Sequence, residues 1–189
     1  MAATVAVLTS PGNAAEADPG RDAISPGTEL QVYSNDEYVR IFGAERALAE
    51  GVPLPGQTQE DNSRITPPDP SIPWHRINYS SLDWDYNDIP TRNGTNDFGA
   101  RHAANKHNMR SKKAVTAPYA GRADRGSGNR WEYWGVITSG SAVRMDITSV
   151  AERGERGPGG VRTPDGRPIG TITAYCRGQT LCPDWVNHI

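Results

Sequence analysis

No apolar stretch of the 189-residue chain approaches the roughly 20 residues that a membrane-spanning helix requires. The chain also lacks an excess of either charge, because its 20 Lys and Arg and 22 Asp and Glu leave a net charge of −2. Dedicated nucleic-acid binders usually carry a basic surface, and highly charged disordered chains carry a large net charge. The composition therefore argues against a membrane protein, a dedicated nucleic-acid binder and a disordered polyelectrolyte.

The sequence also lacks the short motifs that identify many enzymes. It contains neither GxGxxG nor GxxxxGK[ST], the glycine-rich patterns that cradle phosphates, and neither HExxH nor GxSxG. His102 and His107 are five residues apart, which does not place both imidazoles on one helix face as metal ligands. We therefore expect no metal site.

Cysteine is scarce, with only Cys176 and Cys182, and one such pair without a His cluster makes a poor zinc site. Residues 1–17 combine small apolar residues with Ala15-Glu16-Ala17, which is typical of a secretory signal peptide and its cleavage site. We expect this leader to be removed, leaving one secreted, extracellular domain over residues 18–189. Because exported proteins fold in oxidising compartments, the two cysteines are expected to form a disulfide.

The 20 Gly and 15 Pro predict a folded domain with long irregular loops. Residues 29–33 are expected to form a short strand. Ser34 and Glu37 follow with the spacing of a capping box, and apolar residues then recur at helical spacing from Tyr38 to Ala49. Gly51, with prolines beyond it, is expected to end this helix.

The middle of the chain, residues 57–128, is more weakly patterned. Its prolines at positions 67–73 predict an extended loop. Residues 74–79 and 112–117 are expected to be short strands, and residues 97–108 a short helix capped by Asn96 or Asp97.

The last third has the clearest strand patterns, with β-branched and aromatic residues or strict alternation at residues 131–138, 143–147 and 168–175. A Gly- and Arg-rich loop, residues 151–166, contains Glu152 and Glu155. Acids beside glycine in a loop are a plausible setting for a catalytic carboxylate. The alternative is a solvated loop whose charges pair with one another.

These parts occur in a characteristic order. Val32-Tyr33-Ser34-Asn35-Asp36 precedes a helix and the exit Gly51–Gly56, and the strands at 131–137 and 143–147 precede the two acids and Gly159-Gly160-Val161. This order resembles the catalytic subunit of cholera-toxin-like and heat-labile-enterotoxin-like mono-ADP-ribosyltransferases. The resemblance covers the front and back of the chain and leaves the middle unmatched.

The resemblance implies an α+β fold, a single domain in which two mainly antiparallel sheets flank a cleft for NAD, here a substrate. It implies a secreted toxin or virulence protein that transfers ADP-ribose to an unidentified macromolecular acceptor or hydrolyses NAD. Glu155 is then the catalytic acid that stabilises the cation formed as nicotinamide leaves, and Glu152 orients the acceptor. Thr116 lines the cleft, and Ser34 occupies the position of the family's NAD-binding arginine.

Two other hypotheses stay open. A member of this fold without turnover would bind a protein or ligand through its long loops, and the serine at position 34 favours that reading. A small secreted ribonuclease-like toxin would use His102, Lys106 and His107 for acid–base chemistry and phosphate contact.

Overall fold

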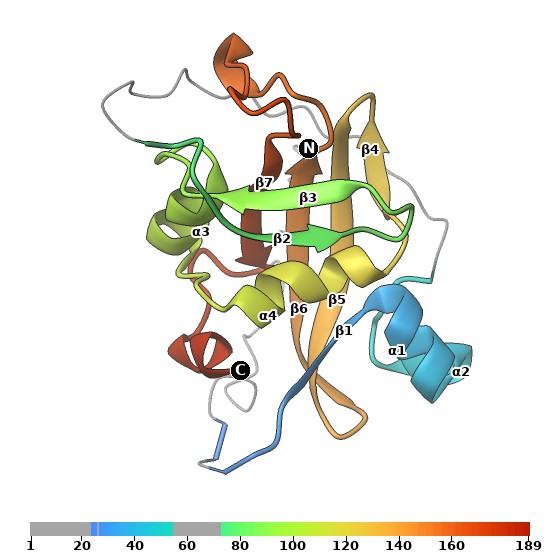
Figure 1. Ribbon diagram of the computed structural model, residues 1–189. Coiled ribbons are helices and arrows are strands. Elements are labelled where there is room, and N and C mark those ends of the chain that lie inside the picture. Colours follow the sequence, from blue (N-terminus) through green and yellow to red (C-terminus); the bar gives the residue numbers. More distant parts are fainter. Residues whose placement is uncertain (1–23, 26, 55–72) are drawn as a thin grey trace, which may run out of the picture.

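The computed structural model describes residues 24–25, 27–54 and 73–189. The expected leader and most of the expected proline-rich loop lie outside these residues. Two antiparallel sheets form the described fold (Figure 1). The larger sheet has the strand order β1-β5-β6-β7, with β4 paired to β5, and the smaller sheet pairs β2 with β3. The expected α+β fold with two mainly antiparallel sheets is thereby confirmed.

The strands of the larger sheet are β1 (Gln31–Ser34), β4 (Arg125–Ser127), β5 (Arg130–Ser139), β6 (Ala142–Glu152) and β7 (Gly170–Cys176). Those of the smaller sheet are β2 (Ile77–Leu82) and β3 (Asp88–Arg92). The β5–β6 hairpin lies at the centre of the larger sheet. Its tight turn requires a left-handed residue, and Gly140 (φ 59°) supplies that conformation.

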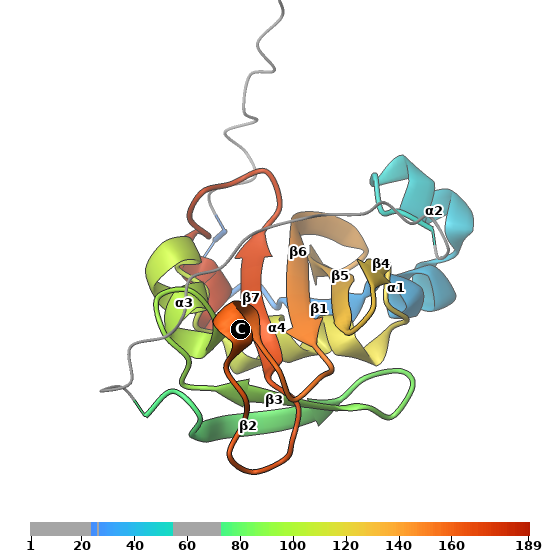
Figure 2. The ribbon, with the colours of Figure 1, turned by 90° about the horizontal axis from the view of Figure 1, so that it is seen from above.

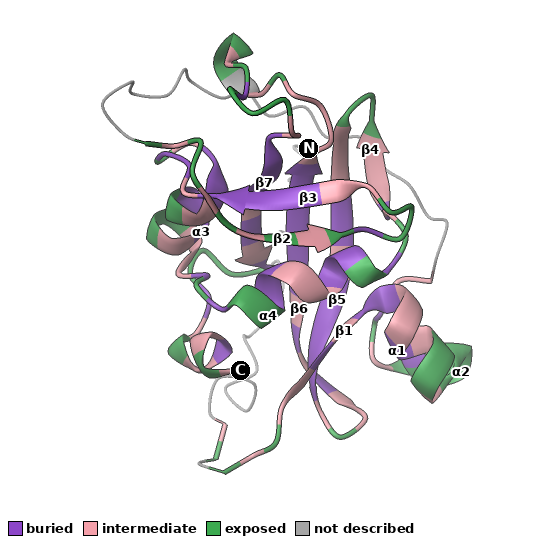
Figure 3. Cartoon of the chain, viewed as in Figure 1, coloured by how far each residue is buried: buried purple, intermediate pink, exposed green. Residues whose placement is uncertain are grey.

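Strand β6 is longer than the sequence predicts. It pairs with β5 from Ala142 to Glu152, so Glu152 lies opposite Arg130 at the end of the ladder. The expectation that the loop begins at residue 151 is therefore wrong by two residues. Backbone pairing with β5 and β7 extends the strand through Val150 and Ala151, whose side chains are buried. Figure 3 shows β5 and β6 as mainly buried strands.

A short helix, α4 (Lys112–Thr116), and the 3-10 turn η1 (Ala117–Ala120) lie between the two sheets (Figure 2). The sequence predicted a strand here, and that prediction is wrong. The Ser111 hydroxyl accepts a hydrogen bond from the Ala114 backbone and starts a helical turn. That turn buries Ala114 and Val115 against the large sheet. The segment is too short for its sequence pattern to distinguish a strand from a helix, so tertiary packing decides its conformation.

The N-terminal helix begins as predicted. Ser34 and Glu37 form the capping box at the start of α1 (Asn35–Phe42). The single helix expected to continue to Ala49 is wrong, because Gly43 at φ 87° interrupts it and α2 (Ala44–Ala49) follows separately. Figure 3 shows α2 as mainly exposed, consistent with an apolar stripe that only partly faces the core.

The helix α3 (Gly99–His107) packs beside β7 and matches the expected helix. Its N-cap is Phe98, which makes no side-chain cap bond, so the predicted cap at Asn96 or Asp97 is wrong. Asn108 ends the helix in the left-handed conformation (φ 53°). This residue also ties α3 to the C-terminal segment.

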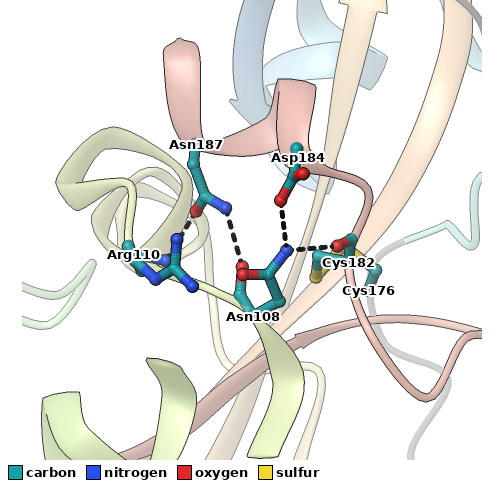
Figure 4. The surroundings of a disulfide bond; sticks show 6 residues. All are labelled: Asn108, Arg110, Cys176, Cys182, Asp184 and Asn187. Carbon is teal, nitrogen blue, oxygen red and sulfur yellow. Dashed lines mark hydrogen bonds between the residues drawn. A yellow bond between two sulfur atoms is a disulfide. The ribbon is translucent and has the colours of Figure 1, made fainter. Parts of the chain in front are cut away.

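The expected disulfide is confirmed between Cys176 and Cys182, whose Cα atoms are 5.3 Å apart. Figure 4 shows how the loop that it closes lies against Asn108. The Asn108 side chain donates to the Cys182 carbonyl and to the Asp184 carboxylate, each at 2.9 Å. Asn187, in the last 3-10 turn η3 (Asp184–His188), donates back to the Asn108 carbonyl. The disulfide loop and the last turn are therefore anchored on the end of α3.

Side chains hold the small sheet to the large one. The Thr91 and Thr171 hydroxyls are 2.7 Å apart, and the Tyr119 hydroxyl lies 2.9 Å from Thr171. Arg92 of β3 is fully buried and makes a two-point ion pair with Asp165, at 2.9 Å for both contacts. Its guanidinium also donates to the Pro168 carbonyl, so this buried charge is well satisfied.

Candidate functional site

An open pocket of about 480 Å³ lies where β5 begins and β6 ends, beside the segment that follows β6. The residues that line it are Asn129, Arg153, Gly154, Glu155, Arg156 and Arg162. Three arginines, one asparagine and one glutamate therefore line one pocket. Such a set of donors is suited to a ligand that carries phosphate groups.

Backbone hydrogen bonds fix the segment that forms the pocket wall. Arg153 donates to the Asn129 carbonyl at 2.7 Å, which ties the wall to the β4–β5 turn. Thr163 donates to the Glu155 carbonyl, and Arg156 and Arg162 form an isolated antiparallel bridge. The loop is thus a small hairpin that presents Glu155, Arg156 and Arg162 together.

The carboxylate of Glu155 is ion-paired within this hairpin. One of its oxygens accepts from both the Nε and the Nη2 atoms of Arg162, at 3.0 and 2.8 Å. The side chain of Glu155 is 41% exposed, so the pair is open to solvent and to ligands. Such a pair contributes little to stability and is free to exchange partners.

Glu152 lies two residues before Gly154, on the last position of β6. Its Oε1 atom accepts from the Gly154 backbone N–H at 3.1 Å. Burial raises the pKa of Glu152 above its usual range, and the Gly154 hydrogen bond opposes part of that shift. The two acids therefore differ in environment, Glu155 being more open and ion-paired, and Glu152 more enclosed.

Arg153 forms the inner wall of the pocket and is held by an aromatic and acidic cluster. Its guanidinium lies 5.1 Å from the Trp131 ring centre and donates from Nε to the Tyr133 hydroxyl at 3.0 Å. It also pairs with Asp83 at 2.7 Å and with Asp85 at 3.2 Å. Burial, with the Asp83 carboxylate beside it, raises the pKa of Tyr133, so this phenol stays protonated.

The structure brings some of the predicted site residues together and leaves others apart. Glu155 lines the pocket, and Glu152, three residues earlier, lies behind the wall and is bonded to Gly154, which lines it. Ser34 pairs with Gly135, which is five positions from Arg130 along β5, or about 17 Å at the usual rise of a strand. Its hydroxyl is buried and bonded to Glu37.

Thr116 ends α4, between the two sheets. The preceding carbonyl, of Val115, accepts from Ser149, which lies three positions before Glu152 on β6. This places Thr116 roughly 10 Å along the strand from the acids. The sequence placed Ser34 and Thr116 in the cofactor-binding set, and these positions keep both outside the pocket wall.

The histidines form a second cluster, on α3. The rings of His102 and His107 have centres 5.4 Å apart, and His107 lies 5.4 Å from the Tyr175 ring. Burial lowers the pKa of both imidazoles, so both are neutral near pH 7. Within residues 24–25, 27–54 and 73–189, no group of three or more His, Cys, Asp or Glu side chains is arranged to hold a metal ion.

None of the helices in the described part of the chain has the length and apolar character that a bilayer crossing requires. Comparisons of the chain with protein-family models, with curated proteins and with solved structures found no match.

Sequence reasoning missed the residues that complete the pocket. Arg153 lies in the Gly- and Arg-rich loop that the sequence marked, but it was given no role there, and Asn129 lies outside any marked segment. The buried Asp83, which holds Arg153, was missed as well. The run Asp83-Trp84-Asp85-Tyr86, with acids and aromatics in alternation, was the signal in the sequence.

Proposed function

We propose that this pocket binds NAD and that the protein is a mono-ADP-ribosyltransferase-like or NAD glycohydrolase enzyme, with Glu155 as its catalytic carboxylate. The observation that carries the proposal is the position of Glu155 among three arginines in one open pocket. Guanidinium groups match the geometry of a diphosphate, and the carboxylate supplies negative charge beside it. The disulfide supports export, and we propose that the protein acts outside the cell that makes it.

The arrangement suggests a route for the reaction. The bond between ribose C1′ and the nicotinamide nitrogen breaks, and its electron pair neutralises the pyridinium as nicotinamide leaves. The positive charge that develops on the ribose is stabilised by the Glu155 carboxylate. Water or an acceptor nucleophile then attacks C1′ and loses a proton.

Two features prepare Glu155 and Glu152 for different parts in that route. A diphosphate competes for Arg162, and this competition releases the Glu155 carboxylate from its ion pair. Glu152 has a pKa raised by burial, which suits a group that accepts the proton of the incoming nucleophile.

The test is nicotinamide release from NAD by the full chain and by the Glu155→Gln variant. We expect release by the wild type and a loss of at least about 100-fold in Glu155→Gln, because the stabilising charge is gone. Glu45→Gln, a change of the same chemistry on the exposed helix α2, is the matched control and retains activity. Equal rates in Glu155→Gln and wild type would reject the proposal.

A second candidate is a member of the same fold that binds NAD without cleaving it. The ion pair between Glu155 and Arg162 favours this alternative, because it occupies the carboxylate. NAD binding without nicotinamide release by folded protein is the result that would select it.

The ribonuclease-like alternative has one supporting observation, the contact between the His102 and His107 rings. Acid–base catalysis by a histidine pair needs one neutral and one protonated imidazole, and burial, which lowers the pKa of both rings, moves that condition toward more acidic pH. RNA degradation that is lost in His102→Ala would support it, and intact RNA at high protein concentration would exclude it.

A further inference from the structure

The turn between β2 and β3, residues 83–87, presents two aromatic side chains to solvent. Tyr86 is 82% exposed and Trp84 is 48% exposed. Tyr86 also has φ 62°, a left-handed conformation that is unfavourable for a bulky residue. Strain of this kind persists where the surroundings impose it, and it is concentrated at ligand-binding sites.

The buried side chain of Asp83 imposes the conformation of the turn. Its Oδ1 atom accepts from the backbone N–H of Asp85 at 3.0 Å and from that of Asn87 at 2.9 Å. The Asn87 side chain donates to the same carboxylate. The backbone that carries the two aromatic residues is therefore fixed before any ligand arrives.

The same carboxylate also holds the wall of the pocket. The Oδ2 atom of Asp83 accepts from the Tyr133 hydroxyl at 2.8 Å and pairs with Arg153 at 2.7 Å. Asp85, next to Tyr86, makes the second ion pair with Arg153. The aromatic turn and the arginine-lined pocket are therefore fixed to each other through one guanidinium.

We propose that the turn and the pocket form one nucleotide-binding surface, in which the Tyr86 ring stacks on the adenine base while the arginines bind the diphosphate. Naming adenine rests on the proposed function, since NAD and ADP-ribose carry that base. Aromatic rings bind bases through their faces, and arginines bind phosphates through paired N–H groups. One face of the Trp84 ring is already covered by Arg122, at 5.2 Å, which leaves Tyr86 as the main platform.

The test is the affinity of the full chain for ADP-ribose, compared with ribose 5-phosphate, by calorimetry. We expect Tyr86→Ala to weaken ADP-ribose binding about tenfold, and Tyr86→Phe to retain wild-type affinity because the stacking face remains. Binding of ribose 5-phosphate is expected to be unchanged in both variants. Leu82→Ala, a large exposed residue of the same hairpin, is the matched control and binds like wild type.

Binding without turnover separates this inference from the proposed function. Weaker ADP-ribose binding in Tyr86→Ala, with no NAD cleavage by any variant, would support the platform and reject the enzyme. Glu155-dependent cleavage with the same KM for NAD in Tyr86→Ala and wild type would reject the platform alone. Equal loss in Tyr86→Ala and Leu82→Ala, or no binding of ADP-ribose by folded wild type, would also overturn it.

Discussion

Replacing Asp165 with asparagine tests the role of the buried Arg92, which ties the small sheet to the segment between β6 and β7. Arg92 has no exposed surface, and Asp165 is the carboxylate that neutralises it. Asp165→Asn keeps the size of the side chain but removes its negative charge. It also replaces one of the two acceptor oxygens by an NH₂ group, which cannot accept a hydrogen bond from the Arg92 guanidinium. The substitution thus leaves a cation buried among the Pro168 and His75 carbonyls without a counterion.

The expected cost follows from burial. Removing one partner of a buried ion pair typically costs 3–5 kcal/mol. Because the Asp165 side chain is 36% exposed, we expect a loss of about 3 kcal/mol in the free energy of unfolding. For a chain of this length that corresponds to a fall in Tm of roughly 6–12 °C. Asp88→Asn is the control, because it removes an equally close but solvent-accessible pair with Arg167 and is expected to cost less than about 1 kcal/mol.

The assay is urea denaturation followed by tryptophan fluorescence at several pH values. The Arg92 hydrogen bond holds the pKa of Asp165 below its usual range, so its stabilising effect is complete above the unfolded value near 4 and is lost as pH falls through the lowered folded pKa. The difference between wild type and Asp165→Asn should therefore shrink at pH 2. A loss in Asp165→Asn no larger than in Asp88→Asn would refute the reasoning from burial.

Four other changes test separate parts of the structure. Burial raises the pKa of Asp124 to about 7, so the free energy of unfolding of the wild type should decrease as the pH rises from 4 to 7. Asp124→Asn should remove this pH dependence, which urea denaturation at each pH measures. Cys182→Ser opens the short disulfide loop and should cost roughly 2 kcal/mol, a difference that dithiothreitol abolishes. Ser34→Ala removes the capping box and should cost about 1 kcal/mol, and its KM for NAD checks the predicted cofactor contact. Tyr86→Gly should raise Tm by relieving the left-handed strain and should weaken ADP-ribose binding.

Local signals in the sequence predicted the elements that local interactions determine. The capping box at Ser34 and Glu37 needs only residues three apart, and β5 is rich in residues that favour strands. Where tertiary packing decides, the pattern was misleading. The α4 segment is five residues long, and its two buried residues suit a strand as well as a helix turn.

The candidate site was predictable only in part, for a similar physical reason. Glu152 and Glu155 belong to one loop, so their spacing placed them together. Other contributors come from distant parts of the chain, namely Asn129 in the pocket wall and Asp83, which holds Arg153. Local patterns in a sequence do not show which residues 70 positions apart come into contact, as Asp83 and Arg153 do.

The attachment of the small sheet has a consequence for how the protein opens. The β2–β3 ladder is separate from the main ladder, and no backbone pairing between described strands joins the two. Side chains attach it instead, among them the polar contacts of Thr91, Arg92 and Asp83 and the buried Ile89. We expect amide hydrogens of β2 and β3 to exchange with solvent well before those of β5 and β6, through partial unfolding that leaves the large sheet intact. Because Arg153 and Asp165 share those links, the wall of the pocket would loosen in the same event.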